Sequence, residues 1–175
     1  VYSRRLTDVT DSLPEVVKSV GEHVKACEAI LEGEVIAIGE DNTPMLFQHL
    51  MRRFRRVHEI EKMTKQIPVK LYLFDLLFAD GKSLIDEPYV ERRRKLKEIV
   101  GSIQLTKQIV TSNLQEAENF LKEALREGHE GLVAKKLDSP YTPGIRGKRW
   151  FKIKQVLEPL DLVIVAAEYG YGRRR

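Results

Sequence analysis

"IPVKLYLFDLLFADG", residues 67–81, is the stretch of this sequence that decides the fold. It is rich in branched and aromatic residues and closes on an Ala-Asp-Gly turn, which predicts a strand buried in a sheet. Strand alternation predicts two faces, one with Tyr72, Phe74, Leu76 and Phe78 and the other with Leu71, Leu73, Asp75 and Leu77. Asp75 is out of place among apolar neighbours and needs a partner, whereas Phe74 is suited to stacking on a flat ring.

Shorter elements surround this strand on both sides. Further strands are predicted at 1–5, 29–39, 103–111, 130–136, 150–154 and 160–169. Helices are predicted at 10–24, 43–54, 55–66, 88–101 and 113–128, with Thr43 and Asn113 as caps and Pro44 at a first helical position. Because some strands are adjacent and others are separated by helices, the chain is predicted to be α+β, with antiparallel sheets flanked by helices.

Composition places the chain among globular proteins. It has 175 residues, 42% of them hydrophobic and 32% charged, and a net charge of +4 that suits a polyanionic partner. The single Cys27 excludes an internal disulfide framework, so an intracellular location is expected, in the cytoplasm or in a eukaryotic nucleus. No apolar run approaches the roughly 18–20 residues that span a bilayer, and no membrane partner is expected.

Cations are concentrated in "EGLVAKKLDSPYTPGIRGKRWFKIK", residues 130–154, which reads as two strands around a loop. Strand alternation places Trp150, Lys152 and Lys154 on one face. An exposed sheet edge would explain the lysines alone. Arg146 and Arg149 in the loop add forked donors, and together these cations favour a phosphate ligand.

Acidic residues stand at two strand starts. Glu32 and Glu34 share a strand face with aliphatic residues, where a carboxylate needs a cation, a metal or a hydroxyl donor unless the strand turns out to solvent. Glu130 is a third acid at the start of a strand. Together these acids would suit Mg²⁺ bound beside phosphates, because Mg²⁺ takes one or two carboxylates plus phosphate oxygens.

Two basic runs lie on predicted helices, at 52–56 and 91–97. A solvated helix face explains each run, and contact with a phosphate backbone is the alternative. The sequence leaves both interpretations open.

Five of these stretches form an ordered set: "SRRLTDVT", "LEGEVIAI", "YLFDLLF", "EGLVAKK" and "WFKIK". In order and approximate spacing the set resembles the nucleotidyltransferase motifs of ATP-dependent DNA ligases, most closely the archaeal type related to the eukaryotic replicative ligase. The resemblance implies a nucleotidyltransferase (ATP-grasp-like) adenylation domain, of which residues 1–155 would be part. Residues 156–175 would then be a linker and the first strand of an OB-fold domain.

The resemblance also implies ATP and Mg²⁺ as cofactors and assigns roles by position. Glu34 would bind the ribose hydroxyl or a metal, Phe74 would stack on adenine, and Glu130 would associate with the metal. The remaining nucleotide contacts, near ribose or phosphate, would come from Arg4, Arg146, Lys152 and Lys154.

The family nucleophile is the lysine of a K-x-D-G motif, and no K-x-D-G occurs in these residues. That lysine is expected before Val1, so this chain would supply the nucleotide pocket without the catalytic residue. In the implied reaction the lysine takes AMP from ATP, AMP moves to the 5′-phosphate of a nick, and the 3′-hydroxyl displaces it. Nicked double-stranded DNA is the implied partner, and a sliding clamp is a further candidate through a region that would precede Val1.

Other classes share parts of this pattern. RNA ligases and mRNA-capping guanylyltransferases use the same nucleotidyltransferase motifs. A basic, non-catalytic nucleic-acid-binding module is the alternative outside the enzymes.

Overall fold

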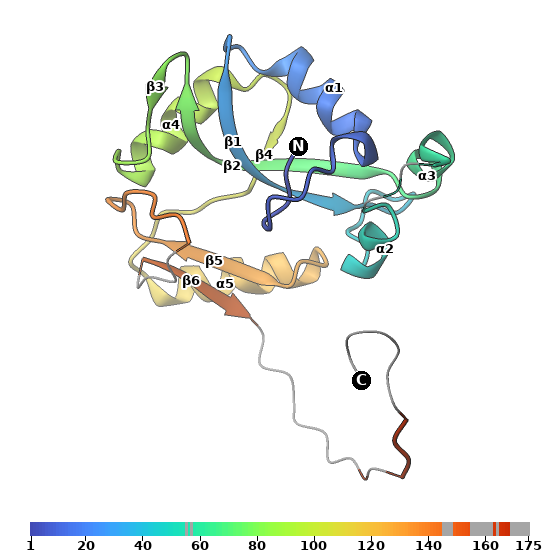
Figure 1. Cartoon of the computed structure of the whole chain (residues 1–175). Coiled ribbons are helices and arrows are strands. Elements are labelled where there is room, and N and C mark those ends of the chain that lie inside the picture. Colours follow the sequence, from blue (N-terminus) through green and yellow to red (C-terminus); the bar gives the residue numbers. More distant parts are fainter. Residues whose placement is uncertain (55, 57, 145–148, 155–162, 164, 169–175) are drawn as a thin grey trace.

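The computed structural model describes residues 1–54, 56, 58–144, 149–154, 163 and 165–168. Figure 1 shows an upper body built around a twisted sheet and a smaller sheet with its helix below it. In chain order the elements are η1 (Thr10–Ser12), α1 (Pro14–His23), β1 (Ala29–Ala37), α2 (Phe47–Met51), α3 (Ile60–Gln66), β2 (Val69–Ala79), β3 (Lys82–Ser83), α4 (Tyr89–Ile99), β4 (Gln104–Leu105), α5 (Leu114–Arg126), β5 (Gly131–Lys135) and β6 (Trp150–Lys154). The α+β prediction is confirmed.

The upper sheet is centred on β2, the strand predicted first from the sequence. β1 and β3 pair with β2 in antiparallel fashion, and the two-residue β4 adds one short parallel pairing. The core between β2 and α4 consists of Leu73, Leu76, Leu84, Leu96, Val100 and Ile103. The apolar content of residues 67–81 is thus explained by burial against this helix.

The predicted alternation of β2 is wrong in its second half. The pairing with β1 skips a residue twice, at Phe74 and at Leu77, so β2 carries two bulges. Each bulge shifts the alternation by one residue, and Leu73 and Leu76 therefore enter the same core although the sequence placed them on opposite faces.

The lower sheet consists of β5 and β6, which pair in antiparallel fashion over five residues each. Helix α5 packs against β5. Asn113 caps this helix as predicted, because its side chain accepts hydrogen bonds from the backbone N–H of Gln115 at 2.8 Å and of Glu116 at 3.4 Å. Past the other end of the helix, Gly128 has a φ of +85°, as expected for a residue that ends a helix.

Several predicted elements differ from the structure. The strand predicted at 1–5 is reduced to one bridge between Tyr2 and Asp8, and the helix predicted at 55–66 begins at Ile60. The helix predicted to begin at Pro44 begins at Phe47, because Gly39 and Met45 donate backbone hydrogen bonds to Thr43 and Ala37, which fold 37–45 into a turn. Of the strand predicted at 103–111, only Gln104–Leu105 pairs with β2. Half of the strand predicted at 160–169 lies outside the described residues, and the described residues 163 and 165–168 form no strand. The boundary at 155/156 stays a prediction.

Within the described part of the chain, no helix has both the length and the apolar composition needed to cross a membrane.

Candidate functional site

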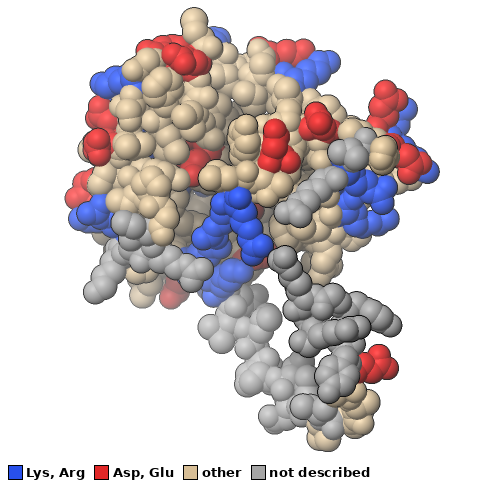
Figure 2. Space-filling model, in the orientation of Figure 1, with Lys and Arg blue, Asp and Glu red and all other residues tan. Residues whose placement is uncertain are grey.

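One face of the lower sheet carries the two lysines that are predicted to bind phosphate. Val133 lies opposite Lys152 and Lys135 lies opposite Trp150 in the β5–β6 register. Directly opposed residues of an antiparallel pair share a face, so Lys135, Trp150, Lys152 and Lys154 lie on the same side of this sheet. Figure 2 shows Lys and Arg atoms gathered between the upper and lower sheets.

The acid Glu130 meets this basic face at its outer end. The Lys154 Nζ donates to the Glu130 Oε2 at 2.7 Å, and both side chains are exposed. The ion pair with Lys154 and the charge of Lys152 hold the pKa of Glu130 below its usual value. Glu130 is therefore ionised at neutral pH and next to the lysines predicted to bind phosphate.

At the inner end of the same face, Lys135 reaches the upper sheet. Its Nζ lies 3.8 Å from the ring centroid of Trp150, 4.2 Å from that of Phe74 and 4.6 Å from that of Tyr89. We call this group the aromatic cage of Lys135. It joins three elements, β6, β2 and α4, and it brings the predicted adenine-stacking residue next to the predicted phosphate face.

A buried ion pair joins β2 to α4 next to the aromatic cage. Arg92 on α4 donates to both carboxylate oxygens of Asp75 on β2, at 2.8 and 2.9 Å, and both side chains are completely buried. The same guanidinium donates to the carbonyl oxygens of Glu87 at 2.6 Å and Ser139 at 3.0 Å. Arg92 is thus the partner that Asp75 needs, and it also holds the loop that follows β5.

Glu32 links β1 to this loop as well. The hydroxyl of Tyr141 donates to the Glu32 carboxylate. Burial raises the pKa of Glu32, while the bond from Tyr141 opposes that rise. Burial and the nearby Glu32 carboxylate also raise the pKa of Tyr141. This bond explains why an acid is tolerated beside the aliphatic residues of β1.

The remaining predicted site residues are less closely tied to this group. Glu34 is exposed on β1 opposite Tyr72, and Arg4 is exposed in the turn between Tyr2 and Asp8. Arg146 lies outside the described residues. The structure therefore brings Phe74, Lys152, Lys154 and Glu130 to one face through Lys135, and the placement of the others at this face stays a prediction.

No protein-only metal centre is formed in the described part of the chain, where no group of three or more His, Cys, Asp or Glu residues could hold an ion. A Mg²⁺ ion that shares one or two carboxylates with phosphate oxygens does not need such a group. The Glu130 carboxylate fits that role, because it is exposed and ionised beside Lys154.

Three arginines of the two basic runs are buried and structural, which neither interpretation of the sequence anticipated. Arg53 is buried and donates to Ser12, Glu15 and Ile67. Arg92 and Arg93 are buried against β2, where Arg93 donates to the carbonyl oxygens of Leu73 and Thr106. Exposed Arg94 pairs with Glu91 and Glu98 on its own helix, as a solvated face would.

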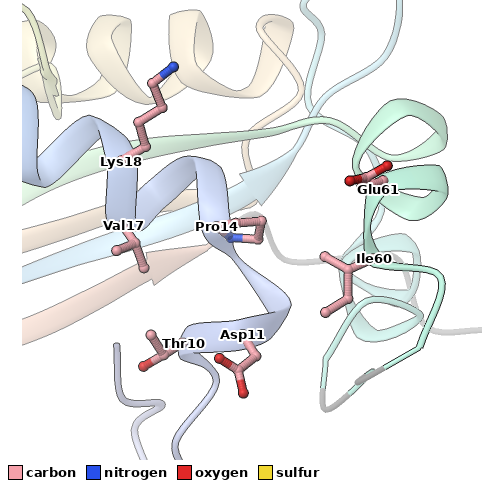
Figure 3. Close-up of a pocket in the computed structure, with 7 residues that line it drawn as sticks. All are labelled: Thr10, Asp11, Pro14, Val17, Lys18, Ile60 and Glu61. Atoms are coloured by element: carbon pink, nitrogen blue, oxygen red, sulfur yellow. The ribbon is translucent and has the colours of Figure 1, made fainter.

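A separate open groove of about 600 Å³ lies between η1, α1 and α3 (Figure 3). Figure 3 shows Ile60 extending from α3 toward Pro14, while the Lys18 amino group points away. The lining residues are Thr10, Asp11, Pro14, Val17, Lys18, Ile60 and Glu61. None of the predicted nucleotide-binding residues is among them, so this groove is distinct from the candidate site.

Sequence reasoning missed Lys135, Tyr89 and Tyr141 as neighbours of the site. The signal for Lys135 was present, because pairing Trp150 with the end of the first strand of the hairpin places this lysine on the Trp150 face. Tyr89 and Tyr141 carry no comparable pattern, since only the packing of α4 and of the loop after β5 brings them to Trp150, with ring centroids 6.2 Å away in each case.

Comparison with known proteins supports the motif assignment. The family model described as "ATP dependent DNA ligase domain" matches residues 1–154. The chain is 54% identical over 177 residues to a DNA ligase of Thermococcus onnurineus and 50% identical over 174 residues to one of Methanothrix thermoacetophila. Each alignment covers 99% of this chain and 32% of the relative, so the chain spans about a third of these proteins.

A solved structure shares the fold. A mycobacterial DNA ligase D complexed with ATP and MES matches 87% of this chain and 46% of its own chain, with a TM-score of 0.65 and 26% sequence identity. The ligase domain of LigD from M. tuberculosis gives the same values.

Proposed function

This chain belongs to the family of ATP-dependent DNA ligase domains, and we propose that it forms the nucleotide-binding part of a ligase that seals nicks in double-stranded DNA. The observation that carries the proposal is the shared face of the lower sheet, where Lys152 and Lys154 lie on the same side as Lys135, whose ammonium contacts Phe74. A flat ring beside a row of cations suits a nucleotide, with its base at one end and its phosphates at the other.

Individual roles follow from this orientation of the nucleotide. Phe74 stacks on the base, and Lys152 and Lys154 neutralise the phosphates. Arg4 and Arg146 add contacts near the ribose or phosphates, and Glu34 binds a ribose hydroxyl or the metal. The similar mycobacterial ligase was solved with ATP, which supports ATP as the nucleotide of this chain.

Mg²⁺ is proposed as the second cofactor, held by Glu130, with Glu34 as a second candidate ligand, together with phosphate oxygens. When bound it would offset the charge repulsion between an attacking group and the phosphates. The chain's own contribution is the lysine pair, which stabilises negative charge on the transferring phosphoryl group.

The substrate and setting are proposed from the relatives. Relatives named DNA ligase favour nicked duplex DNA over the substrates of RNA ligases and guanylyltransferases. Their archaeal origin favours the cytoplasm. A sliding clamp as partner rests on the sequence resemblance alone.

A first prediction separates binding from covalent chemistry. The chain alone should bind labelled ATP with Mg²⁺ reversibly but form no covalent adenylate, because no K-x-D-G lysine occurs in its residues. Filter binding and denaturing electrophoresis measure the two properties. A longer protein that joins this chain to a K-x-D-G lysine should form the adenylate and seal a 5′-phosphorylated nick. A labelled band from the chain alone would contradict the assignment of the nucleophile.

A second prediction tests the base contact. Phe74→Ala should weaken ATP binding by a factor of about 5–100, since stacking of a base on an aromatic ring contributes roughly 1–3 kcal/mol. Tyr72→Ala is the matched control on the same strand, and it should change ATP affinity by less than about threefold. Titration calorimetry with ATP compares the two variants. Equal losses, or a larger loss for Tyr72→Ala, would remove Phe74 from the proposed role.

A further inference from the structure

The ammonium of Lys135 is in an unusual environment for a charged group. Its Nζ is buried and has no hydrogen-bond acceptor within the described part of the chain. Three aromatic rings surround it, at centroid distances of 3.8, 4.2 and 4.6 Å. Attraction to ring faces therefore takes the place of the hydrogen bonds that a buried ammonium usually makes.

This charge does not serve the stability of the fold. Burial lowers the pKa of Lys135 to about 8, against the opposing effect of Asp75 and Glu32. A lysine with a lowered pKa loses its proton earlier in the folded state than in the unfolded chain. Its charged form therefore disfavours folding at neutral pH, and stability should rise as the pH increases from about 8 toward the ordinary value of 10.5. Methionine would fill a similar volume without that penalty.

The contact with Phe74 indicates what the charge does instead. The ammonium covers one face of the Phe74 ring, so a flat ligand has only the opposite face on which to stack. Phe74 lies at a bulge of β2, where it has no partner residue on β1 to hold its direction. The cation is thus the contact that fixes this ring from the side of the lower sheet.

We propose that Lys135 is a positioning residue for Phe74: held between Tyr89, Trp150 and the ring itself, its ammonium fixes the ring so that one face is open to a nucleotide base. The inference rests on the proposed function, in which Phe74 stacks on the base. It adds that the lysine acts on base binding through the aromatic ring.

The other walls of the cage are themselves fixed. The rings of Tyr89 and Trp150 meet edge to face at 6.2 Å, and Trp150 contacts Tyr141 in the same manner. The charged and titratable groups that face Lys135 are Asp75 on β2, Glu32 on β1, and Arg92 and Arg93 on α4. Asp75 and Arg92 are fully buried in their own ion pair, and Asp75 makes no hydrogen bond to the ammonium.

The test compares three variants of the 175-residue chain in ATP titrations at pH 7. Lys135→Met should weaken ATP binding roughly tenfold, which corresponds to the loss of one desolvated cation–π contact. Lys135→Arg keeps a cation that stacks on rings and should retain affinity within about threefold. Lys136→Met is the control, because this neighbouring lysine is exposed and pairs with Asp138. The ATP affinity of this variant should equal that of the wild type.

A double variant separates positioning from a direct contact with the ligand. In a Phe74→Leu background the ring is absent, and Lys135→Met should then cause no further loss of ATP affinity. If Lys135 contacted the phosphates directly, the tenfold loss would persist in that background and the proposal would be overturned. Tighter ATP binding by the single Lys135→Met variant would also overturn it, since the ammonium would then occupy the place of the base.

Folding is checked with the only tryptophan of the chain, Trp150, which is a wall of the cage. Lys135→Met should unfold at the same or a higher temperature than the wild type, so weaker binding cannot be ascribed to misfolding. The Trp150 emission of the wild type should titrate near pH 8, and this transition should disappear in Lys135→Met. If the wild type binds no ATP, the proposed function is refuted. If it binds ATP but its Trp150 emission shows no transition near pH 8, the proposed role of Lys135 in the aromatic cage is refuted.

Discussion

Replacing Arg92 with methionine is expected to lower the free energy of unfolding by about 3–5 kcal/mol. The substitution leaves the Asp75 carboxylate fully buried without its partner, and a lone buried charge is strongly disfavoured. It also removes the donor to the carbonyl oxygens of Glu87 and Ser139. Urea unfolding followed by Trp150 fluorescence measures the change.

Two further variants show whether burial of the charge is the cause. Arg94→Met lies on the same helix but breaks only exposed ion pairs with Glu91 and Glu98, and it should cost less than about 1 kcal/mol. The double variant Arg92→Met with Asp75→Leu removes both charges and should recover much of the loss. Equal effects of the Arg92 and Arg94 substitutions would contradict the assignment.

Gly131→Ala is expected to destabilise the lower sheet by about 3 kcal/mol, from backbone strain and overpacking together. Gly131 has a φ of +148°, and a Cβ added there would lie 2.1 Å from the carbonyl oxygen of Ile153 on β6. The contact is with backbone, so β5 and β6 must separate at this end to relieve it. The variant should unfold at a lower urea concentration than the wild type. It should also bind ATP more weakly, because separation of the strands moves Glu130 away from Lys154.

Gly21→Ala is the matched control for this substitution. Gly21 lies in α1, and a Cβ added there meets no atom within 4 Å. Alanine should stabilise the helix by about 0.5–1 kcal/mol, because glycine is less favourable in a helix interior. The predicted clash would be contradicted if the free energy of unfolding of Gly131→Ala lay within about 0.5 kcal/mol of the wild-type value.

Elements with a strong local signal could be predicted from the sequence. The apolar run of β2 and the Asn113 cap of α5 each act within a few residues, and the structure has both. Thr43 and Pro44 carry an equally good local signal for a helix start, yet they form a turn. The Gly39 N–H donates to the Thr43 carbonyl oxygen and the Met45 N–H donates to that of Ala37, so residues 37–45 close a turn after β1. Helix propensity does not include this competing use of the same backbone groups.

The part of the site that depends on local patterns could also be predicted from the sequence. Lys152 and Lys154 share a face by strand period alone, and Glu130 lies near them because the hairpin pairs β5 with β6. The partner of Asp75 could not be identified from the sequence, because the three consecutive arginines at 92–94 are equivalent candidates there. Only the orientation of α4 on β2 shows that Arg92 is the partner. Lys135 required both the register of the hairpin and the packing of two sheets.

The bulge at Phe74 has an evolutionary consequence. In a regular strand, exchanging a ligand-facing side chain for one of another size changes the spacing to the partner strand and to the core behind it. Phe74 has no partner on β1, while Leu73 and Leu76 on either side keep their places in the core. Rings of different size at position 74 should therefore leave the pairing with β1 and the core at Leu73 and Leu76 unchanged, and only the contact with Lys135 would need to adjust.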